Sequence, residues 1–331
     1  MPDLFSLATS AAHEAQDRRR QMLRTAFGPT IAAALADASV LEVMVNPDGR
    51  LWIDRASIGR ADSGVRLGTA ETERIIRLVA AHVRREVTDK APIVSAELPD
   101  TGERFEGIMP PVAPGPCFAI RKPAEVPYRL SDYVAGRILT TPQASLLSQA
   151  VRARRNIVVA GGTSSGKTTL VNALLAEVAA LGERVVILED TRELRCAAQD
   201  VVALRTKPGV AVLADLVRST LRLRPDRIIV GEVRGPEALD MLKAWNTGHP
   251  GGLTTVHANS AAAALTRLEQ LVQEAVVTVP RALISEAIDL IVFIKGRGSE
   301  RRVESIVELT RLDELGNYVL KPAAASALHV V

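Results

Sequence analysis

The alternation of apolar and polar positions changes character about 130 residues into the chain. Leu41–Val45 and Leu51–Asp54 flank a turn rich in Asn, Pro, Asp and Gly, which predicts a β-hairpin. Apolar residues at helical spacing within Thr69–Val87 predict a helix, and short apolar runs within Phe105–Ile120 predict strands. These patterns predict a small α+β N-terminal domain over residues 1–127.

The second half follows a different pattern, in which short apolar runs alternate with helical segments. Pro and Gly positions and the break from Lys122 to Pro127 predict a linker at about residues 123–138, followed by a second domain over residues 139–331. Strands are predicted at residues 156–160, 184–188, 201–205, 227–230, 290–294 and 303–309. Helices are predicted at residues 167–181, 212–223, 236–245, 261–272 and 281–287. This alternation predicts an α/β domain of three layers.

Composition narrows the function classes. The 331 residues are 47% hydrophobic and 24% charged, as in an ordinary globular protein of about two domains. The net charge is only +3, and aromatic residues make up 3% of the chain, which counts against a nucleic-acid binder built on stacked aromatic side chains. Two cysteines exclude a disulfide scaffold.

No segment has the sequence of a membrane span. The longest stretch without Asp, Glu, Lys or Arg, Ala244–Thr266, contains His, Asn and several Gly and Thr. The N-terminal residues carry acidic side chains and no apolar core, so we expect no signal peptide and a cytosolic location. Arg18–Arg20 fall in a predicted helix that would suit either docking on anionic lipid or a solvated helix face.

A glycine-rich loop provides the strongest local signal for chemistry. Residues Gly161, Gly162, Thr163, Ser164, Ser165, Gly166, Lys167, Thr168 and Thr169 fit the phosphate-binding pattern G-x-x-x-x-G-K-[ST]. The loop lies between a predicted strand and a predicted helix, which is the context the motif requires. Its glycines allow main-chain amides to approach phosphates, Lys167 supplies a charge to the β- and γ-phosphates, and the Thr168 hydroxyl is placed to bind Mg²⁺.

Two predicted strands end in acidic residues. Arg227–Glu232 is an apolar strand followed by an acid, similar to a Walker B segment, but Gly231 stands where the usual metal-associated Asp would be. The carboxylate of Glu232 is therefore the candidate for polarising water, and Glu189 ends the second such strand. Each acid alone could equally form a surface salt bridge.

Two histidines and several arginines complete the candidates. His257 follows a glycine-rich turn and a short β run, where an imidazole could bind a γ-phosphate; His249, at the start of that turn, is the weaker candidate. Arginines that could stabilise the transferring phosphoryl group are Arg104, Arg121, Arg218, Arg222 and Arg234. Because the chain has 34 Arg and 7 Lys, composition favours none of them.

Four segments, taken in order, establish a family resemblance. They are the loop at residues 161–169, then residues 189–194, 221–234 and 248–260. The chain resembles the secretion ATPase family of type II and type IV systems, with its Walker A, Asp, Walker B and His boxes. Residues 243–252 and the basic residues 296–302 are most similar to the conjugal-transfer ATPases of that family.

The resemblance implies a RecA-like P-loop domain preceded by the smaller α+β domain, assembled into a hexameric ring. It implies an ATPase that uses Mg²⁺, with nucleotide between the two domains. Lys167 and the loop amides would bind the phosphates, while Glu232 and Glu189 orient water and His257 senses the γ-phosphate. Arg104 and Arg121 match the family arginines that reach the phosphates from the N-terminal domain.

The resemblance further implies a motor that powers pilus assembly or substrate transfer. Its partners would be further copies of the chain and secretion or conjugation components of the inner membrane, with the protein in the cytoplasm and peripheral to that membrane. Direct nucleic-acid binding is not expected. Three alternatives remain: a pilus or type II secretion motor, a RecA-like nucleic-acid motor, and a nucleotide-gated scaffold. The four-cysteine zinc segment of many type II enzymes is missing from this sequence, which counts against the type II alternative.

Overall fold

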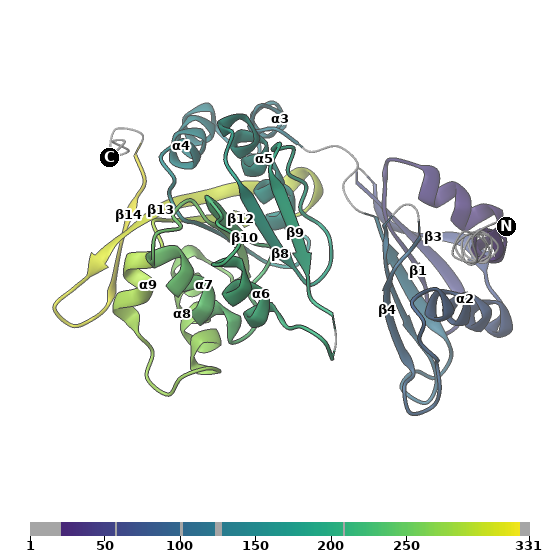
Figure 1. The fold of residues 1–331 in the computed structure, drawn as a ribbon. Helices are drawn as coiled ribbons and strands as arrows, with labels where there is room; N and C mark the ends of the chain where they lie inside the picture. Colours follow the sequence, from purple (N-terminus) through teal and green to yellow (C-terminus); the bar gives the residue numbers. More distant parts are fainter. Residues whose placement is uncertain (1–20, 57, 100–101, 123–127, 208, 325–331) are drawn as a thin grey trace, which may run out of the picture. The chain divides into compact units, whose positions relative to one another are not determined.

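The computed structural model describes residues 21–56, 58–99, 102–122, 128–207 and 209–324 (Figure 1). The chain divides into two compact units, Met1–Glu125 and Val126–Val331. The basic segment Arg18–Arg20 and part of the predicted linker lie outside the described residues. Within the described residues, no helix combines the length and the apolar character needed to cross a bilayer.

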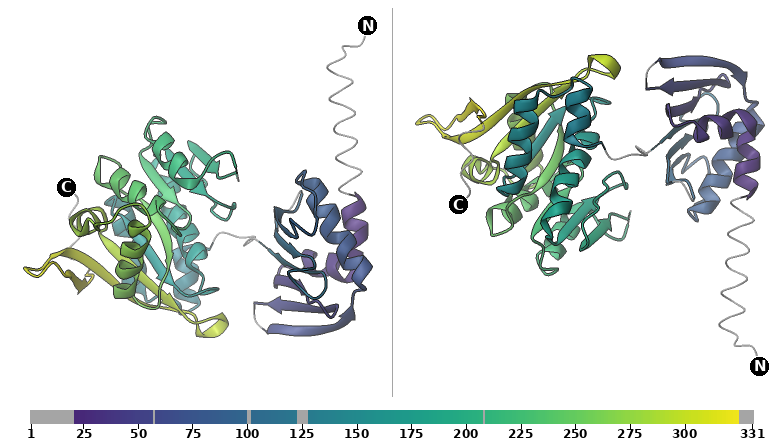
Figure 2. Two further views of the ribbon diagram at one scale, coloured as in Figure 1. Left: turned by 90° about the horizontal axis from the view of Figure 1, so that it is seen from below. Right: turned by 90° about the horizontal axis from the view of Figure 1, so that it is seen from above.

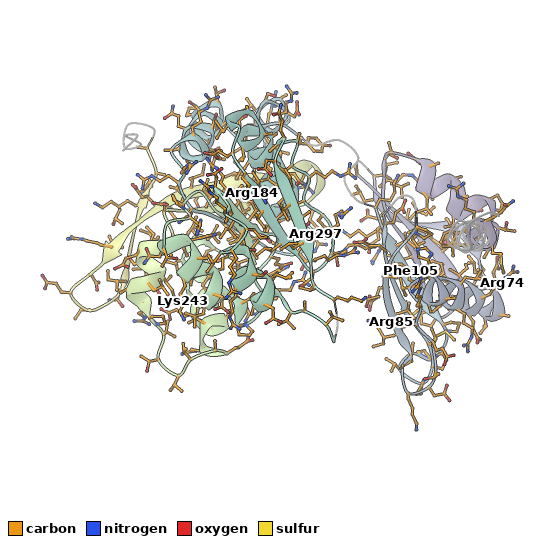
Figure 3. All side chains as sticks on the ribbon, viewed as in Figure 1. Arg74, Arg85, Phe105, Arg184, Lys243 and Arg297 are labelled. Carbon is orange, nitrogen blue, oxygen red and sulfur yellow. The ribbon has the colours of Figure 1, made fainter. Side chains whose placement is uncertain are left out.

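The N-terminal unit contains an antiparallel sheet with strand order β3-β2-β1-β6-β5-β4. Its strands are β1 (Val40–Val45), β2 (Arg50–Arg55), β3 (Gly59–Arg66), β4 (Ile93–Glu97), β5 (Arg104–Ile108) and β6 (Cys117–Arg121). Helical residues 21–36 and α2 (Thr69–His82) share one core with this sheet. Phe105, labelled in Figure 3, is one of the strand residues buried there.

The predicted hairpin is confirmed, because β1 and β2 pair antiparallel with Val43 opposite Ile53. Gly49 in its turn has φ +80°, and a Cβ there would lie 2.3 Å from the carbonyl oxygen of Leu67, so the turn requires glycine. The helix predicted over residues 69–87 ends earlier, at His82. Positions 83 and 84 leave the helical conformation, and Arg84 adopts a positive φ of 56°.

The C-terminal unit contains an eight-stranded sheet with order β14-β13-β12-β7-β11-β10-β8-β9. Its strands are β7 (Ile157–Gly161), β8 (Val185–Glu189), β9 (Val201–Arg205), β10 (Arg227–Val230), β11 (Leu253–His257), β12 (Leu290–Lys295), β13 (Arg302–Leu312) and β14 (Tyr318–Pro322). Its helices are α3 (Leu130–Ala135), α4 (Thr141–Arg152), α5 (Lys167–Val178), α6 (Leu213–Thr220), α7 (Glu237–Asn246), α8 (Ala261–Gln273) and α9 (Arg281–Ala287). Strands β12, β7, β11, β10, β8 and β9 are parallel.

Helices cover both faces of this sheet (Figures 1 and 2). Ile157 and Val159 of β7 pack in one core with α3, α4 and α5, whereas Val158 and Ala160 pack in the other core with α6, α7, α8 and α9. Alternate residues of a strand point to opposite faces, so a strand buried on both sides is apolar throughout. The predicted three-layer α/β fold is confirmed.

The predicted linker contains a helix. Residues 130–135 form α3, and Leu130 and Tyr133 are buried in the core shared with α4 and α5. Helix α4 and strand β14 are further elements that the sequence patterns did not predict. The helix predicted over residues 167–181 ends as α5 at Val178, and a 3-10 turn continues to Leu181, before Gly182 in the left-handed conformation of a helix end.

Candidate active site

The phosphate-binding loop connects β7 to α5. A Cβ on Gly161 would lie 2.4 Å from the carbonyl oxygen of Ile294, and Gly166 has φ +94°, so both positions need glycine. Thr163 and Ser164 are exposed at the tip of the loop, whereas Ser165 is only 3% exposed. The loop thus presents its backbone and the N-terminus of a 12-residue helix, an arrangement that favours anions.

Lys167 extends from the first position of α5 into the site. Its side chain is buried, and Nζ donates a hydrogen bond to the Gly162 carbonyl oxygen at 2.9 Å. Nζ also lies 3.4 Å from Nδ1 of His257, at the end of β11. Thr168 and Thr169 follow in the first turn of the helix and are half-buried. The lysine and the histidine predicted from sequence are therefore adjacent.

Glu232 lies on the other side of His257. Its Oε1 is 2.8 Å from Nε2 of the imidazole, and its Oε2 accepts a hydrogen bond from the guanidinium of Arg234. Thr255 of β11 holds this segment in place, because its Oγ1 donates to the Gly231 carbonyl oxygen at 2.8 Å and its carbonyl oxygen accepts from the main-chain N–H of Val233 at 3.1 Å. Lys167, His257, Glu232 and Arg234 form a continuous row of polar side chains.

Glu189 explains the glycine in the Walker B segment. Strands β8 and β10 are parallel neighbours, and a Cβ on Gly231 would lie 3.0 Å from Cγ of Glu189. The Glu189 side chain is 6% exposed, and its Oε1 accepts hydrogen bonds from the main-chain N–H groups of Glu193 at 2.9 Å and Leu194 at 2.8 Å. This carboxylate fills the space that an aspartate at position 231 would take.

The electrostatics of the row favour a neutral imidazole. Partial burial lowers the pKa of His257 below its ordinary value of 6.5, and the nearby ammonium of Lys167 adds to this lowering. The carboxylate of Glu232 opposes the shift. The same carboxylate raises the pKa of Arg234, so this guanidinium stays charged.

The described polar groups fit a nucleotide with Mg²⁺. Ser165 Oγ in the loop is buried and has no hydrogen-bond partner among the described residues. A buried polar atom without a partner is costly, so a ligand oxygen or an ordered water would stabilise it. The Thr168 hydroxyl, at the start of α5, is the oxygen that this kind of loop offers to Mg²⁺.

The structure distinguishes the remaining candidates of the C-terminal unit by their contacts. His249 lies near the amino end of β10, where its Nδ1 is 3.1 Å from the Pro225 carbonyl oxygen, so it takes no part in the site at the carboxyl ends of the strands. Arg218 of α6 pairs with Asp240 of α7 at 2.9 Å. Composition did not favour Arg234 over the other arginines, but the structure places it against Glu232. Its position two residues after that acid is the sequence feature that could have identified it.

Arg104 and Arg121 lie in the N-terminal unit and form a cross-strand pair between β5 and β6. On either side of them, Glu97 pairs with Arg104 and Glu42 pairs with Arg121. Burial raises the pKa of Glu42, and the charge of Arg121 opposes this shift. Two like charges directly opposite each other are unfavourable in a sheet unless other charges compensate them.

Comparisons with known proteins agree with this geometry. The sequence model described as "Type II/IV secretion system protein" matches residues 27–297. The conjugal transfer protein TrbB of Rhizobium radiobacter is 50% identical over 289 residues, covering 87% of this chain and 89% of the relative. The type IV secretion system protein PtlH of Bordetella pertussis is 36% identical, covering 82% of this chain and 91% of the relative.

A solved structure shows the same fold. The X-ray structure of the ATPase DotB of Legionella pneumophila matches with a TM-score of 0.56 and 19% identity. The match covers 86% of this chain and 76% of the DotB chain. It supports the α/β architecture with a preceding smaller unit.

Proposed function

Because the chain belongs to the type II/IV secretion system protein family, we propose that it binds ATP at residues 161–169 and hydrolyses it to ADP and phosphate. The observation that carries this proposal is the convergence of Lys167, His257, Glu232 and Glu189 at the carboxyl ends of neighbouring parallel strands. Ligand sites of open α/β sheets lie at this edge.

Binding would begin at the loop. The main-chain amides of residues 161–169 and the positive end of α5 attract phosphate oxygens, and the Lys167 ammonium adds a charge beside the γ-phosphate. In the described structure this ammonium is bonded to Gly162 within its own loop. Phosphate oxygens would replace that carbonyl as acceptors.

Water activation would depend on Glu232. His257 and Arg234 each contact one of its oxygens, and a carboxylate has about four acceptor sites, so a remaining lone pair can accept a hydrogen bond from the attacking water and orient it. Neutral His257 lies between this carboxylate and Lys167, where its ring can bind a γ-phosphate oxygen and report that it is present. Glu189 would orient water from the neighbouring strand.

Magnesium bound with the nucleotide would neutralise the negative charge that develops on the phosphate oxygens. Thr168 is the residue that would hold it. We assign Arg104 and Arg121 to stabilising the same charge, as in the family resemblance. An anion beside this pair would accept charge-assisted hydrogen bonds from both guanidinium groups.

The cellular role follows from the named relatives. We infer that the chain is the ATP-driven motor of a type IV secretion or conjugal transfer system, assembles with further copies of itself into a ring, and docks on inner-membrane components from the cytoplasmic side. The similarity to TrbB over most of both chains supports the conjugal transfer assignment.

The test is phosphate release by the purified full-length protein. Lys167→Ala should lower turnover by about 100-fold or more, because a charge that stabilises the transition state is removed. Lys243→Ala is the matched control, since Lys243 is an exposed lysine of α7 that is labelled in Figure 3. Full turnover in a normally folded Lys167→Ala protein would refute the site.

A further inference from the structure

A turn after β12 brings another cation, Arg301, to the phosphate-binding loop. β12 pairs with β7, and Ile294 lies opposite Gly161, the first residue of the loop. Gly296 has φ +81°, and a Cβ there would lie 2.2 Å from a backbone carbonyl oxygen four residues later, so the tight reversal requires glycine. Arg297, in the same turn, is labelled in Figure 3. The reversal directs the chain back toward the loop.

The Arg301 side chain lies along the backbone of the loop. Its Nε and Cζ atoms are 3.1 and 3.2 Å from the position that a Cβ on Gly166 would take. Its Nη2 donates a hydrogen bond to the Ser164 carbonyl oxygen at 3.4 Å, which is a long contact. A side chain at position 166 would therefore displace the guanidinium.

The charge of Arg301 has no acidic partner among the residues that the structure describes. Its Nε is buried and makes no hydrogen bond, and the hydroxyl of Tyr133 is also buried without a partner. Burial raises the pKa of Tyr133, and the positive charge of Arg301 opposes that shift. Arg227 and Arg234, by contrast, each pair with a glutamate.

Arg301 approaches the loop from the side away from the hydrolytic groups. In the sheet, β7 lies between β11 and β12. β11 ends in His257, next to Glu232, whereas Arg301 comes from the turn after β12. With the γ-phosphate at the hydrolytic groups, as proposed above, a cation on this side would face the part of the phosphate chain that ADP and ATP share.

We propose that Arg301 binds the α- and β-phosphates of the nucleotide, and this assignment rests on the proposed ATP-binding function. A partly buried guanidinium without a counter-ion gains most from an anion that can accept several of its N–H groups. The phosphate chain is such an anion. Arg301 then acts in binding, and Glu232 and His257 act in hydrolysis.

The experiment compares substitutions at position 301 in the full-length protein. Arg301→Ala should weaken ADP and ATP binding alike by about tenfold, raising KM with little change in kcat, because a charge-assisted hydrogen bond to phosphate is lost. Arg301→Lys keeps the charge and should recover most of the affinity. Arg301→Met keeps the contact with Gly166 but not the charge, and should bind as weakly as the alanine variant.

The control is Arg302→Ala, which removes the neighbouring exposed arginine and should leave the ADP dissociation constant unchanged. The proposal is overturned if Arg301→Ala binds ADP as the wild type does, or if Arg301→Met recovers affinity and Arg301→Lys does not, since packing on the loop would then be its only role. Failure of the proposed function gives a different result, because the wild type itself would bind neither nucleotide.

Discussion

Single positions determine how this site packs, and Gly231, which leaves room for the side chain of Glu189, is the clearest example. A residue with a side chain at this position would meet Cγ of Glu189 at 3.0 Å and Oε1 at 3.4 Å. Glu189 in turn is held by the main-chain N–H groups of Glu193 and Leu194, so it has little freedom to move away. Position 231 and Glu189 therefore behave as one unit.

Gly231→Ala should lower the free energy of unfolding by about 1–3 kcal/mol, because the added methyl group overpacks the space beside Glu189. Urea unfolding measures this cost. Glu189→Ala removes the obstructing carboxylate, so the double variant should be more stable than the sum of the two single effects predicts. Strict additivity would show that the two side chains do not meet.

His257 should give the enzyme a pH dependence. The imidazole is neutral near pH 7 because partial burial and Lys167 lower its pKa below 6.5. A histidine with a lowered pKa in the folded state contributes stability above about pH 6.5, and this contribution is lost as the pH falls through the folded-state pKa. Protonation would also place a second positive charge beside Lys167.

We expect phosphate release by the wild type to be constant from about pH 8 to pH 6.5 and to fall at lower pH. His257→Gln keeps a polar side chain that does not titrate, and should be slower at pH 8 but lose the decline. A variant that retains the same decline would assign the pH dependence to another group.

Much of this site could be predicted from the sequence, because strand ends and motif spacing place Lys167, Glu189, Glu232 and His257 at one end of a parallel sheet. The contact of Arg301 with the loop could not be predicted. It comes from a turn more than 130 residues after the loop, and only the pairing of β12 with β7 brings it there. The sequence shows that Gly231 replaces the usual Walker B aspartate, but the reason for the replacement is a contact with Glu189 of the neighbouring strand.

At the scale of elements, strands buried on both faces were predicted closely. The run at 227–230 has the bounds of β10, and the run at 290–294 ends one residue before β12 does. β3 was missed because Gly59–Arg66 is an exposed edge strand whose side chains are mostly polar, so neither burial nor alternation marks it. A strand of this kind is defined by its hydrogen bonds to β2.

Arg227 shows how an element can depend on one buried charge. It is fully buried at the start of β10, where it pairs with Glu183 and donates hydrogen bonds to the carbonyl oxygens of Val151 and Gly251. Three different segments are therefore joined through one guanidinium. In the sequence this arginine could not be distinguished from the exposed ones.

Arg227→Ala should lower the free energy of unfolding by about 3–5 kcal/mol, because it leaves two buried carbonyl groups without their donor and leaves Glu183 with Arg154 as its remaining partner. Arg218→Ala is the matched control: its pair with Asp240 leaves the arginine 65% exposed, and its loss should cost less than about 1 kcal/mol. Equal costs for the two variants in urea unfolding would contradict this ranking of the two ion pairs.

At the scale of the whole molecule, each unit has a hydrophobic core of its own. The core of the N-terminal unit contains α2 and the six-stranded sheet, and the two cores of the C-terminal unit enclose the eight-stranded sheet. The loop, both glutamates and His257 belong to the C-terminal unit, and Arg104 and Arg121 belong to the other. Binding and full turnover should therefore be separable.

A fragment of residues 128–331 should fold and bind ADP with nearly the affinity of the full chain, because Arg301 and the loop are both present. Its phosphate release should fall as far as that of the full-length Arg104→Ala, Arg121→Ala double variant, by about 1000-fold if these arginines stabilise the transferring phosphoryl group. Thermal melting and ADP titration establish that the fragment is folded and competent. A much larger loss in the fragment than in the double variant would mean that the N-terminal unit contributes to turnover by another route, such as assembly of the ring. An unchanged rate in the double variant would leave the two arginines as partners of Glu42 and Glu97 within their own sheet.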